Sequence, residues 1–331
     1  MKKLLAMILC LMLVLGMGVC AANAEEVAKG EPMHIIFFVG GDAGDSFASI
    51  VYKGAMAAAE LLEPCNVTVD YVFSGWQTEK MVSQLREAIA MAPDAICMMG
   101  HAGDDALMGL AEEAKDAGIL MMYQNVDVPA VRGEYGGGFV GLLSLEAQGI
   151  ELANRCLADF DLKEGDRALV LGAWGQPGRY YREEGFAATL EGAGIICDRI
   201  VAPPEAATDP QVLLPTISAE LETYPDLKLI QFTGSQTLDA TSMYMEACGK
   251  KPGEVICVGY DTTETILKGF EDGWIQLTAD QQPFLQGFMP VMSAYLTFNY
   301  QLSACTWDTG AGIVDTQNYQ NVADLVTEGY R

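Results

Sequence analysis

The chain has 331 residues, of which 50% are hydrophobic and 19% are charged, and it carries a formal net charge of −26. This acidity repels phosphate backbones, and the 19 Lys and Arg residues are scattered singly, so nucleic-acid binding is excluded. The length exceeds what one hydrophobic core usually supports, and two domains are therefore expected.

The first residues predict export from the cytoplasm. Lys2-Lys3 precedes an apolar run from Leu4 to Cys20, and Ala22-Asn23-Ala24 follows as a small-residue cleavage site. We therefore expect residues 1–24 to be a signal peptide and the mature, extracytoplasmic chain to begin at Glu25.

A lipoprotein signal acylated at Cys20 is the alternative, although Val19 stands where that processing favours a small residue. After the signal, no stretch approaches the ~20 consecutive apolar residues that a membrane helix needs.

Short apolar runs then alternate with amphipathic segments, a pattern typical of βα units. In a first series we expect strands at 35–39, 67–73, 95–99 and 119–123, and helices at 47–62, 79–91 and 105–117. After a turn-rich stretch at 127–138, a second series predicts strands at 139–142, 168–172, 195–201, 229–233 and 255–260, and helices at 145–160, 182–191, 209–223 and 236–247. Two such series imply an α/β fold with two doubly wound, Rossmann-like lobes and a cleft between them.

The motifs of common enzymes are missing from the sequence. His34 and His101 lack neighbours at metal-ligand spacing, and no nucleophile elbow, phosphate loop or dinucleotide fingerprint occurs. Seven cysteines remain after the signal, without a CxxC pair, and several lie inside apolar strand-like runs, where they read as small core residues. We therefore expect no catalytic residue, metal or cofactor.

Several strand-end motifs, in this order and spacing, resemble those of the periplasmic sugar-binding proteins of the ribose-binding type, whose type I solute-binding fold is shared with LacI-type repressor cores. The motifs are Asp45-Ser46-Phe47, Lys53-Gly54-Ala55, Arg182-Glu183-Glu184-Gly185-Phe186, Val258-Gly259-Tyr260-Asp261 and Gln281-Gln282-Pro283. The resemblance spans nearly the whole mature chain. It implies a multi-strand hinge, with 25–127 in the N-terminal lobe, 128–281 in the C-terminal lobe, 282–308 returning to the first lobe and 309–331 returning to the second lobe or the hinge.

The resemblance also implies a sugar site. Arg182 would donate hydrogen bonds to sugar hydroxyls, as its five fixed donors allow, or else be an exposed residue at a helix start. Asp261 would accept them, or else cap the helix expected near Thr263. Gln281 would reach the ligand from near the hinge.

Other positions depart from the family pattern. Asp45 replaces an Asn, Asn125 begins the pair that replaces an Asp-Arg, and Ser235 replaces a later Asn. Leu143-Ser144 replaces an Asp-Asn, so the family's charged and amide contacts are partly lost and ribose itself is not expected. Phe47 would form an apolar floor for a sugar ring, or simply open the apolar stripe of the first helix.

Two loop tryptophans and two polar residues at strand ends are the remaining candidates for ligand contacts. Trp174 and Trp76 lie in expected strand-end loops, where an indole could stack on a ligand ring or serve as a packing anchor. His101 and Gln124 follow or end expected strands.

From these features we expect the chain to be a monomeric binding protein that closes on a sugar-like small molecule and presents it to an ABC permease. A sensory protein that presents the closed form to a membrane receptor or kinase is the alternative. A DNA-binding repressor is excluded by the export signal and the acidity.

Overall fold

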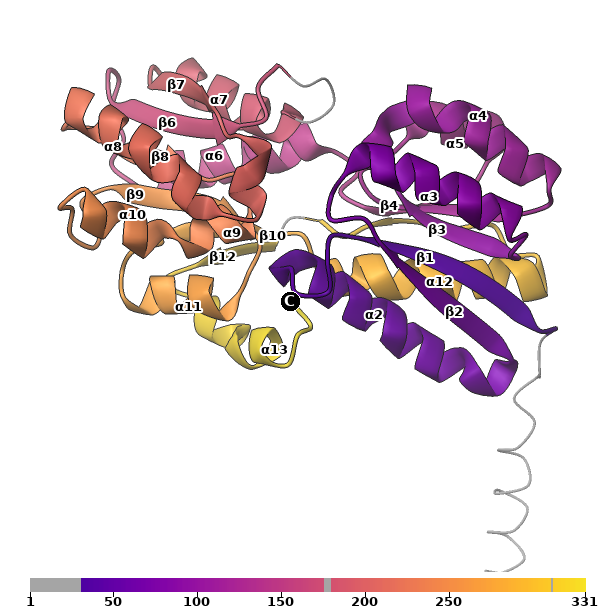
Figure 1. The fold of residues 1–331 in the computed structure, drawn as a ribbon. Coiled ribbons are helices and arrows are strands. Elements are labelled where there is room, and N and C mark those ends of the chain that lie inside the picture. Colours follow the sequence, from indigo (N-terminus) through magenta and orange to yellow (C-terminus); the bar gives the residue numbers. More distant parts are fainter. Residues whose placement is uncertain (1–30, 176–179, 311) are drawn as a thin grey trace, which may run out of the picture.

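The computed structural model describes residues 31–175, 180–310 and 312–331, and the predicted signal peptide lies outside them. These residues form two lobes, each built on a six-stranded sheet with helices on both faces (Figure 1). The predicted α/β fold with two doubly wound lobes is confirmed. Within the described ranges, no helix has the length and apolarity needed to cross a membrane.

The first lobe contains a parallel sheet with the strand order β11-β5-β4-β3-β1-β2. Its strands are β1 (Met33–Gly40), β2 (Val67–Phe73), β3 (Ala95–Met99), β4 (Leu120–Asn125), β5 (Gly138–Gly141) and β11 (Thr306–Asp308). Its helices are α2 (Ser46–Leu62), α3 (Thr78–Ala90), α4 (Gly103–Asp116), α5 (Pro129–Tyr135) and α12 (Pro283–Tyr300). All five residues of β3 are buried, as expected for a strand covered on both faces.

The second lobe has the strand order β12-β10-β9-β8-β6-β7, in which only β12 runs antiparallel to its neighbour. Its strands are β6 (Arg167–Gly172), β7 (Ile196–Val201), β8 (Leu229–Gln231), β9 (Ile256–Tyr260), β10 (Leu277–Asp280) and β12 (Gly312–Asp315). Its helices are α6 (Leu145–Asp159), α7 (Tyr181–Gly192), α8 (Leu214–Thr223), α9 (Ser235–Asp239), α10 (Thr241–Ala247), α11 (Glu264–Glu271) and α13 (Ala323–Thr327). Alternate residues of β6 belong to two different hydrophobic clusters, one on each face of the sheet.

The boundary expected at residues 127 and 128 is wrong. Strand β5 pairs in parallel with β4, so the first lobe continues to Gly141 before the chain crosses over. The turn-rich stretch that suggested a boundary holds helix α5, which connects two strands of the same sheet. The chain crosses between the sheets after β5, after β10 and after β11.

The returning helix α12 docks on α2 through two glycines. A Cβ atom at Gly54 would lie 2.1 Å from the carbonyl oxygen of Phe284, and one at Gly287 would lie 1.9 Å from that of Val51. Neither position can hold a side chain without separating the helices. The glycine of the Lys53-Gly54-Ala55 motif is therefore a packing residue that brings the chain back to the first lobe.

Candidate functional site

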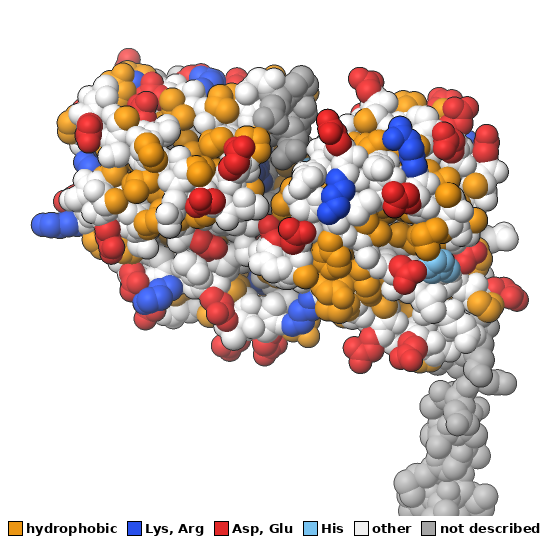
Figure 2. All heavy atoms as spheres, viewed as in Figure 1, with side chains coloured by type: hydrophobic (Ala, Val, Ile, Leu, Met, Phe, Trp, Pro, Cys, Tyr) orange, Lys and Arg blue, Asp and Glu red, His pale blue; other side chains and the backbone are white. Residues whose placement is uncertain are grey.

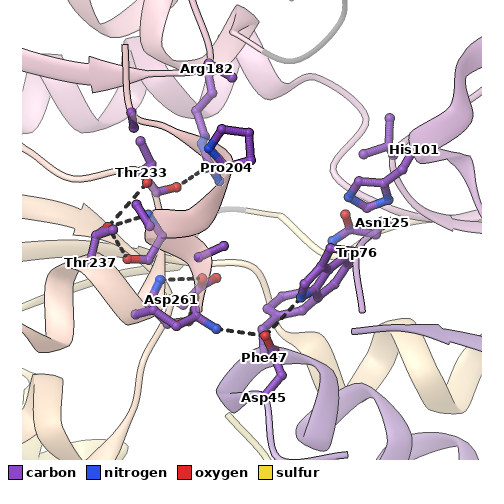
Figure 3. Close-up of a pocket in the computed structure, with 18 of the residues that line it drawn as sticks. Asp45, Phe47, Trp76, His101, Asn125, Arg182, Pro204, Thr233, Thr237 and Asp261 are labelled. Carbon is purple, nitrogen blue, oxygen red and sulfur yellow. Dashed lines mark hydrogen bonds between the residues drawn. The ribbon is translucent and has the colours of Figure 1, made fainter. Parts of the chain in front are cut away.

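A cavity of about 420 Å³ lies between the lobes, at the carboxyl ends of strands from both sheets. Strand ends of parallel sheets leave such a crevice because the following loops diverge. Figure 3 shows Arg182, Thr233 and Asp261 of the second lobe on one side, and Phe47, Trp76 and His101 of the first lobe on the other. The cavity thus has a polar wall and an aromatic wall.

Arg182 is held on the polar wall by three contacts. Its guanidinium stacks on the ring of Tyr260 at 3.6 Å from the centroid, and Nη2 donates to the carbonyl oxygen of Thr233 at 2.6 Å. Nη2 also lies 3.5 Å from Oε1 of Glu183. Its Nε is buried and has no hydrogen-bond partner among the described residues, so one donor of a fixed guanidinium remains unused.

Asp261 is a buried carboxylate beside this arginine. Its Oδ1 accepts from Gln281 Nε2 at 2.6 Å and its Oδ2 accepts from the backbone N–H of Ser235 at 3.2 Å. Burial raises the pKa of Asp261 to about 6, against the opposing effects of Arg182 and of the bond from Gln281. The helix-cap alternative is wrong, because Thr263 caps α11 by accepting from the backbone N–H of Ile266.

The aromatic wall is built from three rings. The Trp76 ring lies 6.1 Å from that of Phe47 and 5.3 Å from that of His101, both at 50°. A Cβ atom at Gly41 would lie 2.7 Å from the Trp76 Nε1, so the indole needs a glycine beneath it.

Three cavity residues have left-handed backbone conformations, with φ of 59° at Trp76, 63° at Asn125 and 74° at Asp261. Such conformations are uncommon outside glycine and are concentrated at functional sites. Each of these residues lies at or just beyond the end of a strand, where the chain turns to direct a side chain into the cavity.

Eight of the ten predicted site residues line the cavity. They are Asp45, Phe47, His101, Asn125, Arg182, Ser235, Asp261 and Gln281. Trp76, one of the two tryptophans considered as ligand contacts, lines it as well.

Gln124 and Trp174 do not line the cavity, and both predictions are corrected. Gln124 is fully buried and donates from Nε2 to the carbonyl oxygen of Phe38, since its side chain leaves β4 on the opposite face from that of Asn125. Trp174 folds back on its own strand, where Nε1 donates to the carbonyl oxygen of Val170.

Sequence reasoning missed most of the wall that follows β8. Thr233, Gly234, Gln236 and Thr237 all line the cavity, and their short polar run after an apolar strand could have identified them. The Pro203-Pro204 turn, which leads into the short helix η3 (Pro204–Ala207), also lines it. Within the described ranges, no group of three or more His, Cys, Asp or Glu side chains could hold a metal ion.

Two doubly wound lobes around a shared cavity define a solute-binding protein of type I architecture. The chain belongs to the periplasmic binding protein domain family, whose model matches residues 36–299. The predicted resemblance to the ribose-binding type is thereby confirmed. The family consists of extracytoplasmic binding proteins, and this chain is a binding protein and not an enzyme.

Two curated relatives match the chain. The xylose/arabinose-binding protein XylF of Sulfolobus acidocaldarius is 26% identical over 280 residues, covering 78% of this chain and 66% of that protein. The D-ribose/D-allose-binding protein of Pseudomonas aeruginosa is 29% identical over 224 residues, covering 66% of this chain and 67% of that protein. The chain thus spans about two thirds of the length of the curated relatives that it matches.

Solved structures share the fold. A carbohydrate transporter from Acidothermus cellulolyticus in complex with myo-inositol has a TM-score of 0.75 at 21% identity, covering 91% of this chain and 100% of that one. A galactofuranose-binding protein has a TM-score of 0.78 at 14% identity, covering 90% of this chain and 100% of that one.

Proposed function

We propose that this chain is an exported substrate-binding protein that captures a sugar or a similar polyhydroxylated molecule between its lobes and delivers it to an ABC importer. The observation that carries the proposal is the pairing of the two cavity walls. The second lobe offers the Arg182 guanidinium beside the Asp261 carboxylate, and the first lobe offers the aromatic faces of Phe47 and Trp76.

This arrangement suits a sugar ring, whose hydroxyls need charge-assisted hydrogen bonds and whose C–H faces stack on aromatic rings. A cavity of about 420 Å³ falls within the usual size of small-molecule sites. The names of the curated relatives point to the same ligand class. Ligand contacts from both lobes would favour the closed form, which a permease can recognise.

A thermal-shift screen of pentoses, hexoses, polyols and nucleosides tests the proposal, using the chain that begins at Glu25. A tight ligand raises the melting temperature by mass action, and calorimetry then measures its affinity. A sugar among the hits with micromolar or tighter affinity is the expected result. A screen in which only nucleosides bind, or in which nothing binds, contradicts it.

The role in import is tested separately from capture. The bound form is expected to stimulate ATP hydrolysis by the ABC transporter encoded nearest to it, reconstituted in vesicles. If it instead stimulates phosphorylation of a neighbouring histidine kinase and leaves the transporter unaffected, the protein is a sensor and delivery is wrong.

A further inference from the structure

Asp45 joins three separate segments of the molecule. Its Oδ1 accepts from the backbone N–H of Ala48 at 2.7 Å and so caps helix α2. Its Oδ2 accepts from Trp76 Nε1 at 2.9 Å and from Gln236 Nε2, on the second lobe, also at 2.9 Å. These two donors occupy both lone pairs of Oδ2, and Figure 3 shows the two hydrogen bonds meeting at this oxygen.

A second contact between the lobes lies beside the first. Ser46 Oγ and Ser235 Oγ are 3.0 Å apart, and Ser235 Oγ lies 3.1 Å from Oε1 of Gln236. We call Asp45, Ser46, Ser235 and Gln236 the interlobe network. It continues to the polar wall, since the backbone N–H of Ser235 donates to Asp261.

We propose that Asp45 is a positioning residue that couples lobe closure to the orientation of Trp76, and that it is not an acceptor for ligand hydroxyls. Its bond to Gln236 spans the two lobes, so a hinge motion that separates the lobes would break it and closure would form it. The same carboxylate oxygen holds the indole on the aromatic wall. Lobe closure and the placement of Trp76 therefore depend on the same acceptor, Oδ2 of Asp45.

This proposal replaces the ligand-contact role that the family resemblance implied for Asp45. It goes beyond the proposed function because the network forms between protein groups alone, whatever ligand the cavity takes. The ligand-free protein can therefore test it.

Asp45→Asn and Gln236→Leu, singly and together, break the network. An asparagine can keep the Oδ1 bond that caps α2, but its Nδ2 cannot accept from Trp76 or Gln236. Small-angle X-ray scattering on the ligand-free chain should show a larger radius of gyration for each single variant. The double variant should be no more open than Asp45→Asn alone, because both changes remove the same bond.

Asp42→Asn is the matched control, since it makes the same charge change at an exposed position in the same loop. It should leave the radius of gyration unchanged. Tryptophan fluorescence, with Trp76→Phe identifying the signal of that residue, should shift in Asp45→Asn and not in Asp42→Asn.

Two outcomes overturn the proposal. One is a ligand-free Gln236→Leu protein as compact as the parent chain. The other is an identified ligand whose affinity falls in Asp45→Asn but not in Gln236→Leu, which would make Asp45 a direct ligand contact. If Asp45→Asn fails to fold, Gln236→Leu alone decides, because among the described residues the Gln236 side chain bonds to members of the network alone. The absence of any sugar ligand would contradict the proposed function and leave these compactness measurements valid.

Discussion

The two walls of the cavity differ in how much hydrogen-bonding capacity the protein leaves unused. On the first lobe, Trp76 Nε1 already donates to Asp45, and Asn125 Nδ2 donates to Gln286 Oε1 at 2.9 Å. On the second lobe, Nε of Arg182 has no partner among the described residues, and each carboxylate oxygen of Asp261 accepts a single hydrogen bond from them. The first lobe therefore offers mainly apolar faces, and the second lobe offers directed polar contacts.

From this contrast we expect the second lobe to supply most of the hydrogen bonds to a ligand, and the first lobe to shape and cover the site. Each lobe orients its strand-end residues on a rigid sheet, so the polar groups are placed before the ligand arrives.

Removing the arginine of the polar wall should have the largest effect on ligand binding and so test the contrast between the walls most directly. We expect Arg182→Ala to weaken ligand binding by ~2 kcal/mol or more, about a thirty-fold loss, because a charge-assisted donor disappears beside a buried carboxylate. Isothermal titration calorimetry measures the change. Arg199→Ala is the control, since Arg199 pairs with Glu184 and Glu191 outside the cavity and should leave affinity unchanged. Equal losses in both variants would contradict the assignment.

Truncating the aromatic wall should have a smaller effect. We expect Trp76→Ala to cost ~1 kcal/mol of binding free energy, roughly five-fold, and Trp76→Phe to cost less, because stacking supplies less than charged hydrogen bonds. Trp174→Ala is matched in residue type but lies outside the cavity. It should lower the melting temperature without changing affinity. A loss of affinity in Trp174→Ala alone would reverse the correction made for that residue.

The polar wall should also affect how the stability of the folded protein depends on pH. The folded-state pKa of Asp261 is about 6, above the ~3.9 of an unfolded chain, so the folded protein binds the extra proton between these values. Stability should therefore rise as the pH falls from about 6 toward ~4. Urea unfolding across this range measures the slope.

Asp261→Asn should reduce that slope. Burial also raises the pKa of Asp239 to about 6. Asp239→Asn should therefore reduce the slope of stability against pH by a further, separate amount. A slope that Asp261→Asn leaves intact would show that its carboxyl titrates normally in the folded protein.

The family resemblance, supported by position after expected strands, predicted much of this site. Asp261 directly follows β9, Arg182 lies at the start of α7, and both line the cavity. The same criterion failed for Gln124, because neighbouring residues of a strand point to opposite faces and a shift of one position decides which side chain reaches the cavity. It failed for Trp174 because a loop side chain can fold back on its own strand.

The sequence by itself determined the two βα series and the strand ends that carry polar residues, since these depend on local periodicity. Tertiary structure alone decided that β5 completes the first sheet. It alone also joined Asp45 to Gln236, 191 positions away, because strand pairing and contacts between lobes depend on groups that no local pattern relates.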